Sequence, residues 1–321
     1  MLADILNYEP TIPSLWQGRK DSLPGERFFQ RVNFIDIRSQ TALENPQQKI
    51  AILGFCCDEG IKRNEGRIGA QTGPIKLREQ LAKLPYHAQK HLVDVGNIVC
   101  KDGNLEEAQS QLARLVSYLQ EQGYKTVVLG GGHEIAWGHF SGLNSRYQKL
   151  GIINFDAHFD LRPLKDNQLG TSGTPFRQIA QHCMENHQPF SYCCLGIQAL
   201  GNTRSLFSTA DDLKVSYLTA EQINTESLAW QIAFLDDFLL SHDDIYLTIC
   251  LDVFAECFAP GVSAPQAMGL TPWQALPLLK YILQTGKVVS FDVAELSPPL
   301  DEAQKTTRLA ASLVAELLDY Y

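Results

Sequence analysis

The stretch "LGIINFDAHFD", residues 150–160, joins a run of apolar residues to three potential metal ligands. Consecutive apolar positions are typical of a β-strand that is covered on both faces. Asp156, His158 and Asp160 follow at once, and a turn rich in aspartate is the alternative interpretation. Ligands bind at the carboxyl ends of strands in open α/β sheets. The stretch therefore predicts a buried strand that ends in a metal site, suited to an ion such as Mn²⁺ or Zn²⁺.

Similar apolar runs recur on both sides of this stretch and alternate with segments of helical periodicity. Strand candidates lie at 49–56, 125–131, 150–156, 191–197, 214–219, 244–253 and 287–295. Helix candidates lie at 73–84, 104–123, 271–286 and 303–321. Pro74 suits a first helical turn, and Asn104 suits an N-cap. This β–α alternation predicts an α/β protein with a largely parallel sheet and helices on both faces.

Composition and charge are those of a globular protein and argue against nucleic acid and membranes as partners. The 321 residues are 45% hydrophobic and 20% charged, with a net charge of −9. No low-complexity linker is present, so we expect a single domain over residues 1–321, with 1–48 as a loop-rich lead-in. Acidic and basic residues are interspersed, which argues against nucleic acid as a partner. No apolar run approaches the ~20 residues that span a bilayer, so no membrane partner is expected.

The eight cysteines are expected to be free thiols. The chain begins MLADILNYEP, without a basic segment followed by an apolar one, which favours a reducing cytoplasm. Two pairs, Cys56–Cys57 and Cys193–Cys194, are sequence neighbours, a spacing unlike a zinc-binding CxxC motif.

Acidic or imidazole groups follow four of the predicted strands. They are, strand by strand, His133, Asp156 to Asp160, Asp252, and Asp292 with Glu295. A lone histidine after glycines, or one acidic residue in a turn, is more often structural. The convergence of four strand ends nevertheless predicts a metal-dependent hydrolase.

Three motifs resemble the metal-binding motifs of the arginase/agmatinase (ureohydrolase) family. They are "GGGHE" at 130–134, "DAHFD" at 156–160 and the strand that ends at Asp252. The segments "CDEGIKRNEGRIGA" and "SGTPFRQ" are similar to the formimidoylglutamase branch, and the likeness runs from about residue 15 to the C-terminus. The resemblance implies a three-layer α/β/α fold with a mostly parallel eight-stranded sheet. It also implies a homo-oligomer that binds two Mn²⁺ ions per chain and hydrolyses a C–N bond of a small molecule.

The same resemblance assigns ligands to the two ions, with one departure. It assigns one ion to His133, Asp156 and Asp160, and a second to the bridging Asp156, His158 and Asp252. In the family, the third motif reads Asp-x-Asp and its first Asp also bridges, but Cys250 stands there in this chain. A thiolate offers one soft sulfur, so we expect weaker retention of one Mn²⁺, a preference for Zn²⁺, or a one-ion site. An ordinary buried thiol is the alternative.

The formimidoylglutamase branch implies a substrate, N-formimidoyl-L-glutamate, which would yield L-glutamate and formamide in histidine degradation. Glu295 aligns with the family carboxylate that pairs with the substrate amidinium. Phe176 stands where arginases carry a proton-shuttle histidine, which argues against an arginase. Arg177 is the first candidate for binding the substrate carboxylates, followed by Arg63 and Arg67. Each of these arginines could instead form a structural ion pair.

Two other hypotheses stay open. The metal motifs alone also fit another amidine hydrolase, such as an agmatinase or a guanidino-acid hydrolase. Cys250 is also compatible with a metal-depleted homologue that binds a partner without catalysis. A panel of substrates distinguishes a formimidoylglutamase from another amidine hydrolase. The metal content per chain distinguishes either enzyme from a metal-depleted homologue.

Overall fold

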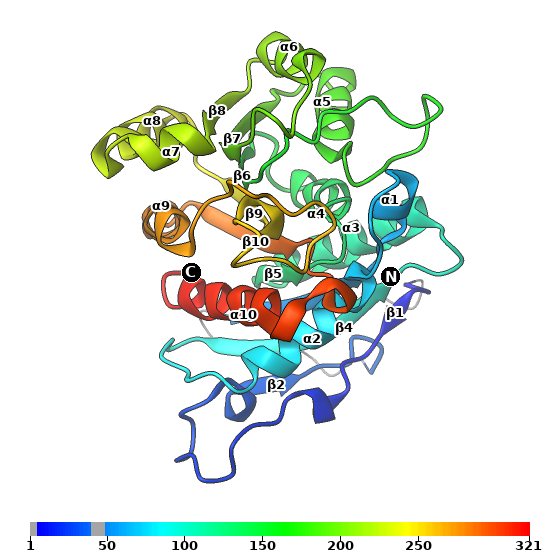
Figure 1. The fold of residues 1–321 in the computed structure, drawn as a ribbon. Helices are drawn as coiled ribbons and strands as arrows, with labels where there is room; N and C mark the ends of the chain where they lie inside the picture. The colour runs from blue at the N-terminus through cyan, green and yellow to red at the C-terminus, as the bar shows by residue number, and fades with distance from the viewer. Residues whose placement is uncertain (1–4, 40–48) are drawn as a thin grey trace.

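The computed structural model describes residues 5–39 and 49–321 (Figure 1). Its strands are β1 (Tyr8–Glu9), β2 (Val32–Phe34), β3 (Lys49–Cys56), β4 (His91–Val99), β5 (Lys125–Leu129), β6 (Gly151–Phe155), β7 (Ser191–Ile197), β8 (Ser216–Thr219), β9 (Ile245–Cys250) and β10 (Val288–Ala294). They form one sheet in the order β1-β4-β3-β5-β10-β9-β6-β7-β8, and β2 also pairs with β4. From β4 to β8 every pairing is parallel. The predicted eight-stranded, mostly parallel sheet is confirmed, with β1 and β2 as short additions at one edge.

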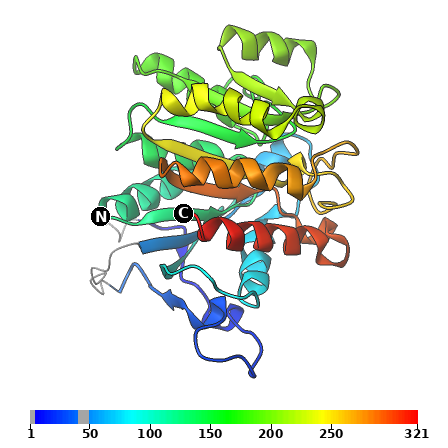
Figure 2. The ribbon, with the colours of Figure 1, turned by 90° about the vertical axis from the view of Figure 1, so that its left-hand side faces the viewer.

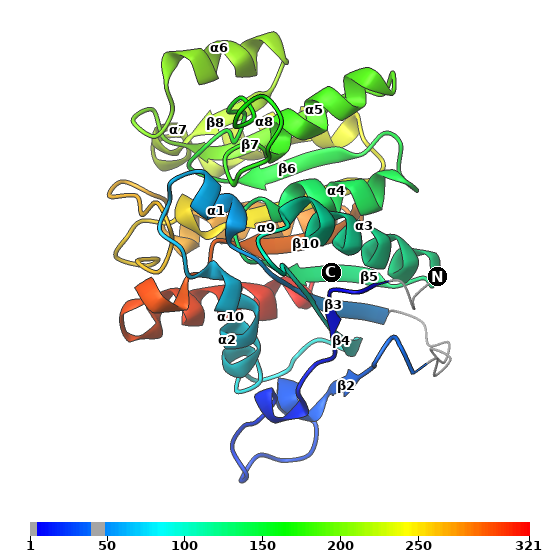
Figure 3. The same cartoon turned by 90° about the vertical axis from the view of Figure 1, so that its right-hand side faces the viewer.

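Helices cover both faces of the sheet. They are α1 (Glu59–Arg63), α2 (Gly73–Leu81), α3 (Leu105–Glu121), α4 (Ile135–Asn144), α5 (Pro175–Glu185), α6 (Arg204–Asp212), α7 (Ala220–Thr225), α8 (Leu228–Leu240), α9 (Pro272–Gln284) and α10 (Lys305–Leu318). The apolar cluster on one face includes α2, α8, α9 and α10 (Figure 2). The cluster on the other face includes α3, α4, α5 and α6 (Figure 3). This is the predicted three-layer α/β/α arrangement.

Local sequence signals account for the helices that were predicted. The side chain of Asn104 accepts a hydrogen bond from the backbone N–H of Glu107 at 3.1 Å, so it caps α3 as expected. Pro74 lies in the first turn of α2, where its missing N–H has no helical partner to lose. Over the described ranges, no helix combines the length and the apolar character needed to cross a membrane.

Strand β4 is absent from the strand candidates because polar residues interrupt its apolar run. Asp94 and Asn97 are buried there, and Arg78 of α2 reaches both. Its Nε donates to Asp94 at 2.7 Å and its Nη1 donates to Asn97 at 2.8 Å. The side chains of Arg78 and Asp94 are both 0% exposed. This mutual pairing satisfies the polar groups inside the core, so the strand is buried although its sequence is not uniformly apolar.

The predicted lead-in, residues 1–48, is attached to the same edge of the sheet. Thr11 and Trp16 both donate hydrogen bonds to the carboxylate of Asp94, at 2.6 Å and 2.8 Å. Residues 1–4 and 40–48 of this segment lie outside the described residues. The described part consists mostly of loops, with β1 and β2 as its two strands.

The order of the strands brings the predicted ligands together. Strands β5, β10, β9 and β6 are neighbours in the middle of the sheet, and all four are parallel. Their carboxyl ends therefore lie at one edge, as in other open parallel sheets where ligands bind. Each of the four segments predicted to carry metal or substrate ligands leaves the sheet at this edge.

Candidate metal centre

A run of three glycines, 130–132, places His133 after β5. The backbone N–H of Gly130 donates to Val293 at 2.7 Å, and that of Gly132 donates to Cys57 at 2.9 Å. A Cβ atom on Gly131 would lie 1.8 Å from the carbonyl oxygen of Cys57. Only glycine fits between the neighbouring strand ends, and this close passage sets His133 above the sheet edge.

Two imidazoles face the carboxylate of Asp156 from different sides. The Nδ1 atom of His133 lies 2.9 Å from Oδ2 of Asp156 and 3.0 Å from Oδ2 of Asp160. The Nδ1 atom of His158 lies 3.5 Å from Oδ1 of Asp156 and 3.1 Å from Oδ2 of Asp252. Asp156 thus presents one oxygen to each imidazole, which is the arrangement of a carboxylate that can bridge two ions.

Two groups of potential ligand atoms result, and they share Asp156. One group is His133, Asp156 and Cys250, and the other is Asp156, His158 and Asp252. Within each group, the ligand atoms lie within 4.8 Å of one another. One nitrogen, one oxygen and one sulfur form the first set, whereas one nitrogen and two oxygens form the second. Both sets fit a divalent ion, so the donor chemistry agrees with a two-ion centre.

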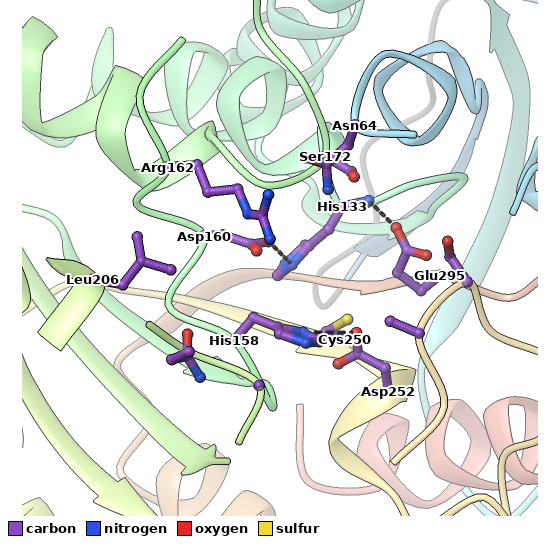
Figure 4. A pocket seen from close by; sticks show the side chains of 14 residues that line it. Asn64, His133, His158, Asp160, Arg162, Ser172, Leu206, Cys250, Asp252 and Glu295 are labelled. Carbon is purple, nitrogen blue, oxygen red and sulfur yellow. Dashed lines mark hydrogen bonds and ion pairs between the residues drawn. The ribbon is translucent and has the colours of Figure 1, made fainter. Parts of the chain in front are cut away.

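These side chains open into a cavity of about 130 Å³ (Figure 4). Its lining includes His133, His158, Asp160, Arg162, Cys250, Asp252 and Glu295. Glu295 accepts a hydrogen bond from the backbone N–H of His133 at 2.8 Å through Oε1. Its other oxygen, Oε2, is buried and has no partner among the described residues. A buried carboxylate oxygen without a partner indicates that a ligand of the cavity supplies one.

Comparison with known proteins agrees with this geometry. Residues 48–319 match the sequence model of the Arginase family. The chain belongs to the arginase family. It is 60% identical over 319 residues to a formimidoylglutamase of Legionella pneumophila, covering 99% of both chains. It is 41% identical over 326 residues to a formimidoylglutamase of Clostridium tetani, covering 98% of this chain and 96% of that one.

A solved structure from the same family resembles the fold. The formiminoglutamase of Trypanosoma cruzi, crystallised with Mn²⁺, superimposes with a TM-score of 0.77 at 25% identity. The match covers 87% of this chain and 95% of that one. The sheet order and the layers described above are therefore those of an arginase-family protein.

Crowded carboxylates shift the pKa values at this arginase-family centre. Burial lowers the pKa of the His133 imidazole, but its hydrogen bonds to Asp156 and Asp160 outweigh burial and leave that pKa well above the usual value. Burial and the charge of Asp156 raise the pKa of Asp160 to about 6. Burial, followed by the charge of Glu134, raises the pKa of Glu295 well above its usual value. Divalent cations among these carboxylates would relieve the repulsion, so the electrostatics also fit metal ions.

A second layer of hydrogen bonds supports His133 from behind. Its Nε2 atom lies 3.0 Å from Oγ1 of Thr248, and this hydroxyl donates to Asp292 at 2.6 Å. The other oxygen of Asp292 lies 2.6 Å from Nδ1 of His139. Asp292 was predicted at a strand end with Glu295, but it lies inside β10 and is fully buried. It supports the centre of this arginase-family chain through Thr248 and does not line the cavity.

Arg177 does not reach the cavity. Phe176 is buried, and its ring centroid lies 5.5 Å from that of His133. Successive residues of an α-helix point about 100° apart, so Arg177 turns away from the centre into solvent. It lines a separate surface cavity with Met184 and Phe190. Its position does not support the expectation that it binds a substrate carboxylate.

The other two predicted arginines hold neighbouring segments in place. Arg63 is ion-paired with Glu106, where Nη2 and Oε2 are 3.1 Å apart, and with Glu59 at 3.4 Å. Arg67 donates to the backbone carbonyls of Val262 and Ser263 at 2.7 Å and 2.9 Å. Neither arginine belongs to the cavity lining. Arg67 nevertheless helps to shape the cavity, because it donates to the backbone of Ser263, which lines the cavity.

Arg162 is the cavity arginine that the sequence interpretation overlooked. It lies two residues after Asp160, and its guanidinium points into the cavity (Figure 4). Across residues 5–39 and 49–321, no ion pair of its side chain is found. The polar side chains of Asn64, Ser172 and Asn202 line the same cavity. The signal was available in "DAHFDLRP", directly after the metal motif.

Proposed function

We propose that this protein is a formimidoylglutamase, which hydrolyses N-formimidoyl-L-glutamate to L-glutamate and formamide. One observation carries the assignment: the same cavity holds an acidic centre and the guanidinium of Arg162, which has no ion-pair partner within residues 5–39 and 49–321. The substrate has the matching charges: a cationic amidine group on its α-nitrogen, one carboxylate on the neighbouring α-carbon, and a second carboxylate at the far end of its side chain. The 60% identity to a formimidoylglutamase over nearly the whole chain supports the same assignment.

The centre is proposed to hold two divalent metal ions. His133, Asp156 and Cys250 would hold one, with Asp160 beside them, and Asp156, His158 and Asp252 would hold the other. The Mn²⁺ in the related Trypanosoma cruzi structure supports manganese as one of these ions. When bound, such ions activate a water molecule for attack on the amidine carbon, and the C–N bond to glutamate then breaks.

Two side chains of the cavity, Glu295 and Arg162, would orient the substrate. The buried Oε2 of Glu295 has no hydrogen-bond partner in the described part of the chain, so it can accept a hydrogen bond from the amidinium. Arg162 can pair with a carboxylate of the glutamate portion, because a guanidinium matches the geometry of a carboxylate. Phe176 is buried beside His133 and does not line the cavity, at the position where the family resemblance implies a histidine in arginases. The cavity is lined by only two histidines among the described residues, His133 and His158.

The competing activities predict different substrates. Agmatine carries no carboxylate, so an agmatinase would leave Arg162 without a partner. A guanidino-acid hydrolase would use Arg162 but would release urea. A metal-depleted binding protein has no need for two complete sets of ligand atoms around Asp156. The ligand sets and Arg162 together argue against an agmatinase and a metal-depleted protein, and the 60% identity to a formimidoylglutamase favours that activity over a guanidino-acid hydrolase.

A substrate panel tests the proposal. The purified full-length protein, supplied with Mn²⁺ or Zn²⁺, is incubated with formimidoylglutamate, arginine, agmatine and a guanidino acid. We expect formamide and glutamate from the first substrate, and no urea from the others. Elemental analysis of the same preparation counts the ions per chain. Urea as the main product, or no formamide with any metal, would reject the assignment.

We further propose that residues 1–321 act as one domain in a cytoplasmic homo-oligomer. All eight cysteines are free thiols in the structure, seven of them at least partly buried, which suits a reducing compartment. Light scattering on the purified protein measures the oligomeric mass. A monomer at micromolar concentration would overturn the oligomer, and a stable disulfide in the native protein would argue against the compartment.

A further inference from the structure

Cys250 forms a ligand group on the His133 side of the metal centre, and its thiol also interacts with the Asp252 carboxyl on the other side. Its sulfur forms a group with His133 and Asp156, whereas the group on the other side is complete without it. The family pattern implies a bridging residue at position 250. In this structure the bridging geometry falls to Asp156 alone, since its two oxygens face different imidazoles.

The sulfur is aimed at the cavity and is not absorbed into the apolar core. Cys250 is the last residue of β9, it is 1% exposed, and it lines the cavity (Figure 4). Neither of the two apolar clusters of the sheet faces includes it. Glu295 lines the same cavity, and its buried Oε2 has no hydrogen-bond partner among the residues that the structure describes, which is an independent sign that a ligand belongs there.

We propose that Cys250 makes the two metal positions chemically unequal. The position formed by His133, Asp156 and Cys250 selects a thiophilic divalent ion such as Zn²⁺ or Co²⁺, bound through the thiolate of Cys250. The position formed by Asp156, His158 and Asp252 keeps nitrogen and oxygen ligands and holds Mn²⁺. This inference rests on the proposed two-ion centre. It adds that the position with Cys250 is the one that prefers an ion other than Mn²⁺.

The preference follows from the ligand atoms. A thiolate is a soft donor that favours Zn²⁺ and Co²⁺ over Mn²⁺, whereas carboxylates suit Mn²⁺. Binding releases the thiol proton to the buffer, because the ligand is the thiolate. Cys250 supplies one sulfur where a carboxylate would supply two oxygens. The first position therefore loses affinity for Mn²⁺, whereas the second position keeps one imidazole nitrogen and two carboxylate oxygens, from His158, Asp156 and Asp252.

Cobalt absorption tests the sulfur ligand directly. The full-length protein is stripped with a chelator and titrated with Co²⁺ alone, and the near-ultraviolet charge-transfer band of a cobalt–thiolate bond is recorded. We expect a band that saturates at one sulfur-bound Co²⁺ per chain. Cys250→Ser should abolish the band, while Asp252→Asn, on the other side of the centre, should keep it. Cys193→Ser, which removes a buried thiol from the core, should also keep it.

The metal preference provides the second measurement. Zn²⁺ outcompetes Mn²⁺ at most protein sites, so the comparison is made between variants. Cys250→Asp should lower the Zn²⁺-over-Mn²⁺ affinity ratio at the first position by about 10-fold or more, because it replaces a soft ligand with a hard one. It should also raise the number of bound Mn²⁺ ions toward two per chain. Circular dichroism and melting curves check that each variant is folded.

Different outcomes overturn different claims. Co²⁺ bound without a charge-transfer band, or an unchanged metal ratio in a folded Cys250→Asp, would overturn the inference. A wild type that holds two Mn²⁺ ions with equal affinity would overturn it as well. If the band appears but no metal form releases formamide from formimidoylglutamate, the proposed function fails and the inference about the ligand stands. If formamide is released and no band appears, the inference alone fails.

Discussion

Thr248 and His133 lie 115 residues apart in the sequence, yet Oγ1 of Thr248 is 3.0 Å from Nε2 of His133. This contact leaves Nδ1 of His133 as the nitrogen that faces Asp156. The hydroxyl of Thr248 in turn donates to Asp292 inside β10. Second-layer contacts of this kind fix the ring orientation of a metal-binding histidine.

Removing the Thr248 hydroxyl should therefore weaken the centre. We expect Thr248→Val to lower the affinity for the ion at His133 by about 10- to 100-fold, the usual effect of losing such a partner. Metal titration by equilibrium dialysis measures this affinity. Thr248→Ser keeps the hydroxyl and should bind metal nearly as well as the wild type. Equal affinities in the Val and Ser variants would show that the contact does not orient His133.

Arg162 and Arg177 provide a matched pair for substrate binding, since both are exposed arginines and only Arg162 lines the cavity. Arg162→Gln should raise KM for formimidoylglutamate by about 10- to 100-fold, because a charged hydrogen bond contributes roughly 1.5–3 kcal/mol. The value of kcat should change much less. Arg177→Gln should leave both parameters as they are. Steady-state kinetics of formamide release measure KM and kcat for both variants. A larger rise in KM for Arg177→Gln than for Arg162→Gln would support Arg177, and not Arg162, as the ligand of the substrate carboxylate.

Glu295→Gln tests the pairing with the amidinium. Glutamine keeps an oxygen for the hydrogen bond from the backbone N–H of His133, so the loop should stay in place. It cannot provide a negative charge for the amidinium. Because a hydrogen bond to a charged group contributes roughly 1.5–3 kcal/mol, kcat/KM should fall by about 10- to 100-fold. The melting temperature should not fall, because the change removes a buried carboxylate whose ionisation is unfavourable. Unchanged kcat/KM in a folded variant would exclude Glu295 from substrate binding.

Arg63 is predicted to act on stability and not on substrate binding. Its hydrogen bond lowers the pKa of the Glu106 carboxyl, so the pair stabilises the fold above the unfolded pKa of about 4.3. That contribution is lost as the pH falls through the lowered folded pKa. Because Glu106 is half exposed, Arg63→Gln should cost no more than about 1 kcal/mol at pH 7. The deficit in the free energy of unfolding should shrink at acid pH.

Urea denaturation of Arg63→Gln and the wild type at neutral and acid pH measures this difference. KM for formimidoylglutamate should be the same in both proteins. A raised KM with unchanged stability would instead support Arg63 as a substrate ligand.

The local pattern of the chain was sufficient for most of the architecture. Apolar runs such as 49–56 and 191–197 correspond to β3 and β7 over the same residues, because strands buried on both faces need apolar side chains at every position. The metal motifs were also predictable, since parallel strands place their carboxyl ends at one edge. His133, Asp156, His158, Asp160 and Asp252 meet there without any sequence proximity between the three motifs.

Tertiary structure alone decided which groups face one another. Strand β4 can bury Asp94 because Arg78 of the preceding helix, α2, pairs with its carboxylate. Arg162 lines the cavity and Arg177 does not, because helix geometry turns Phe176 toward His133 and its neighbour outward. Cys250 joins the His133 side of Asp156, a choice set by the relative positions of β5, β6 and β9. Contacts across the sheet depend on side-chain direction in three dimensions, which residue type and spacing along the chain do not contain.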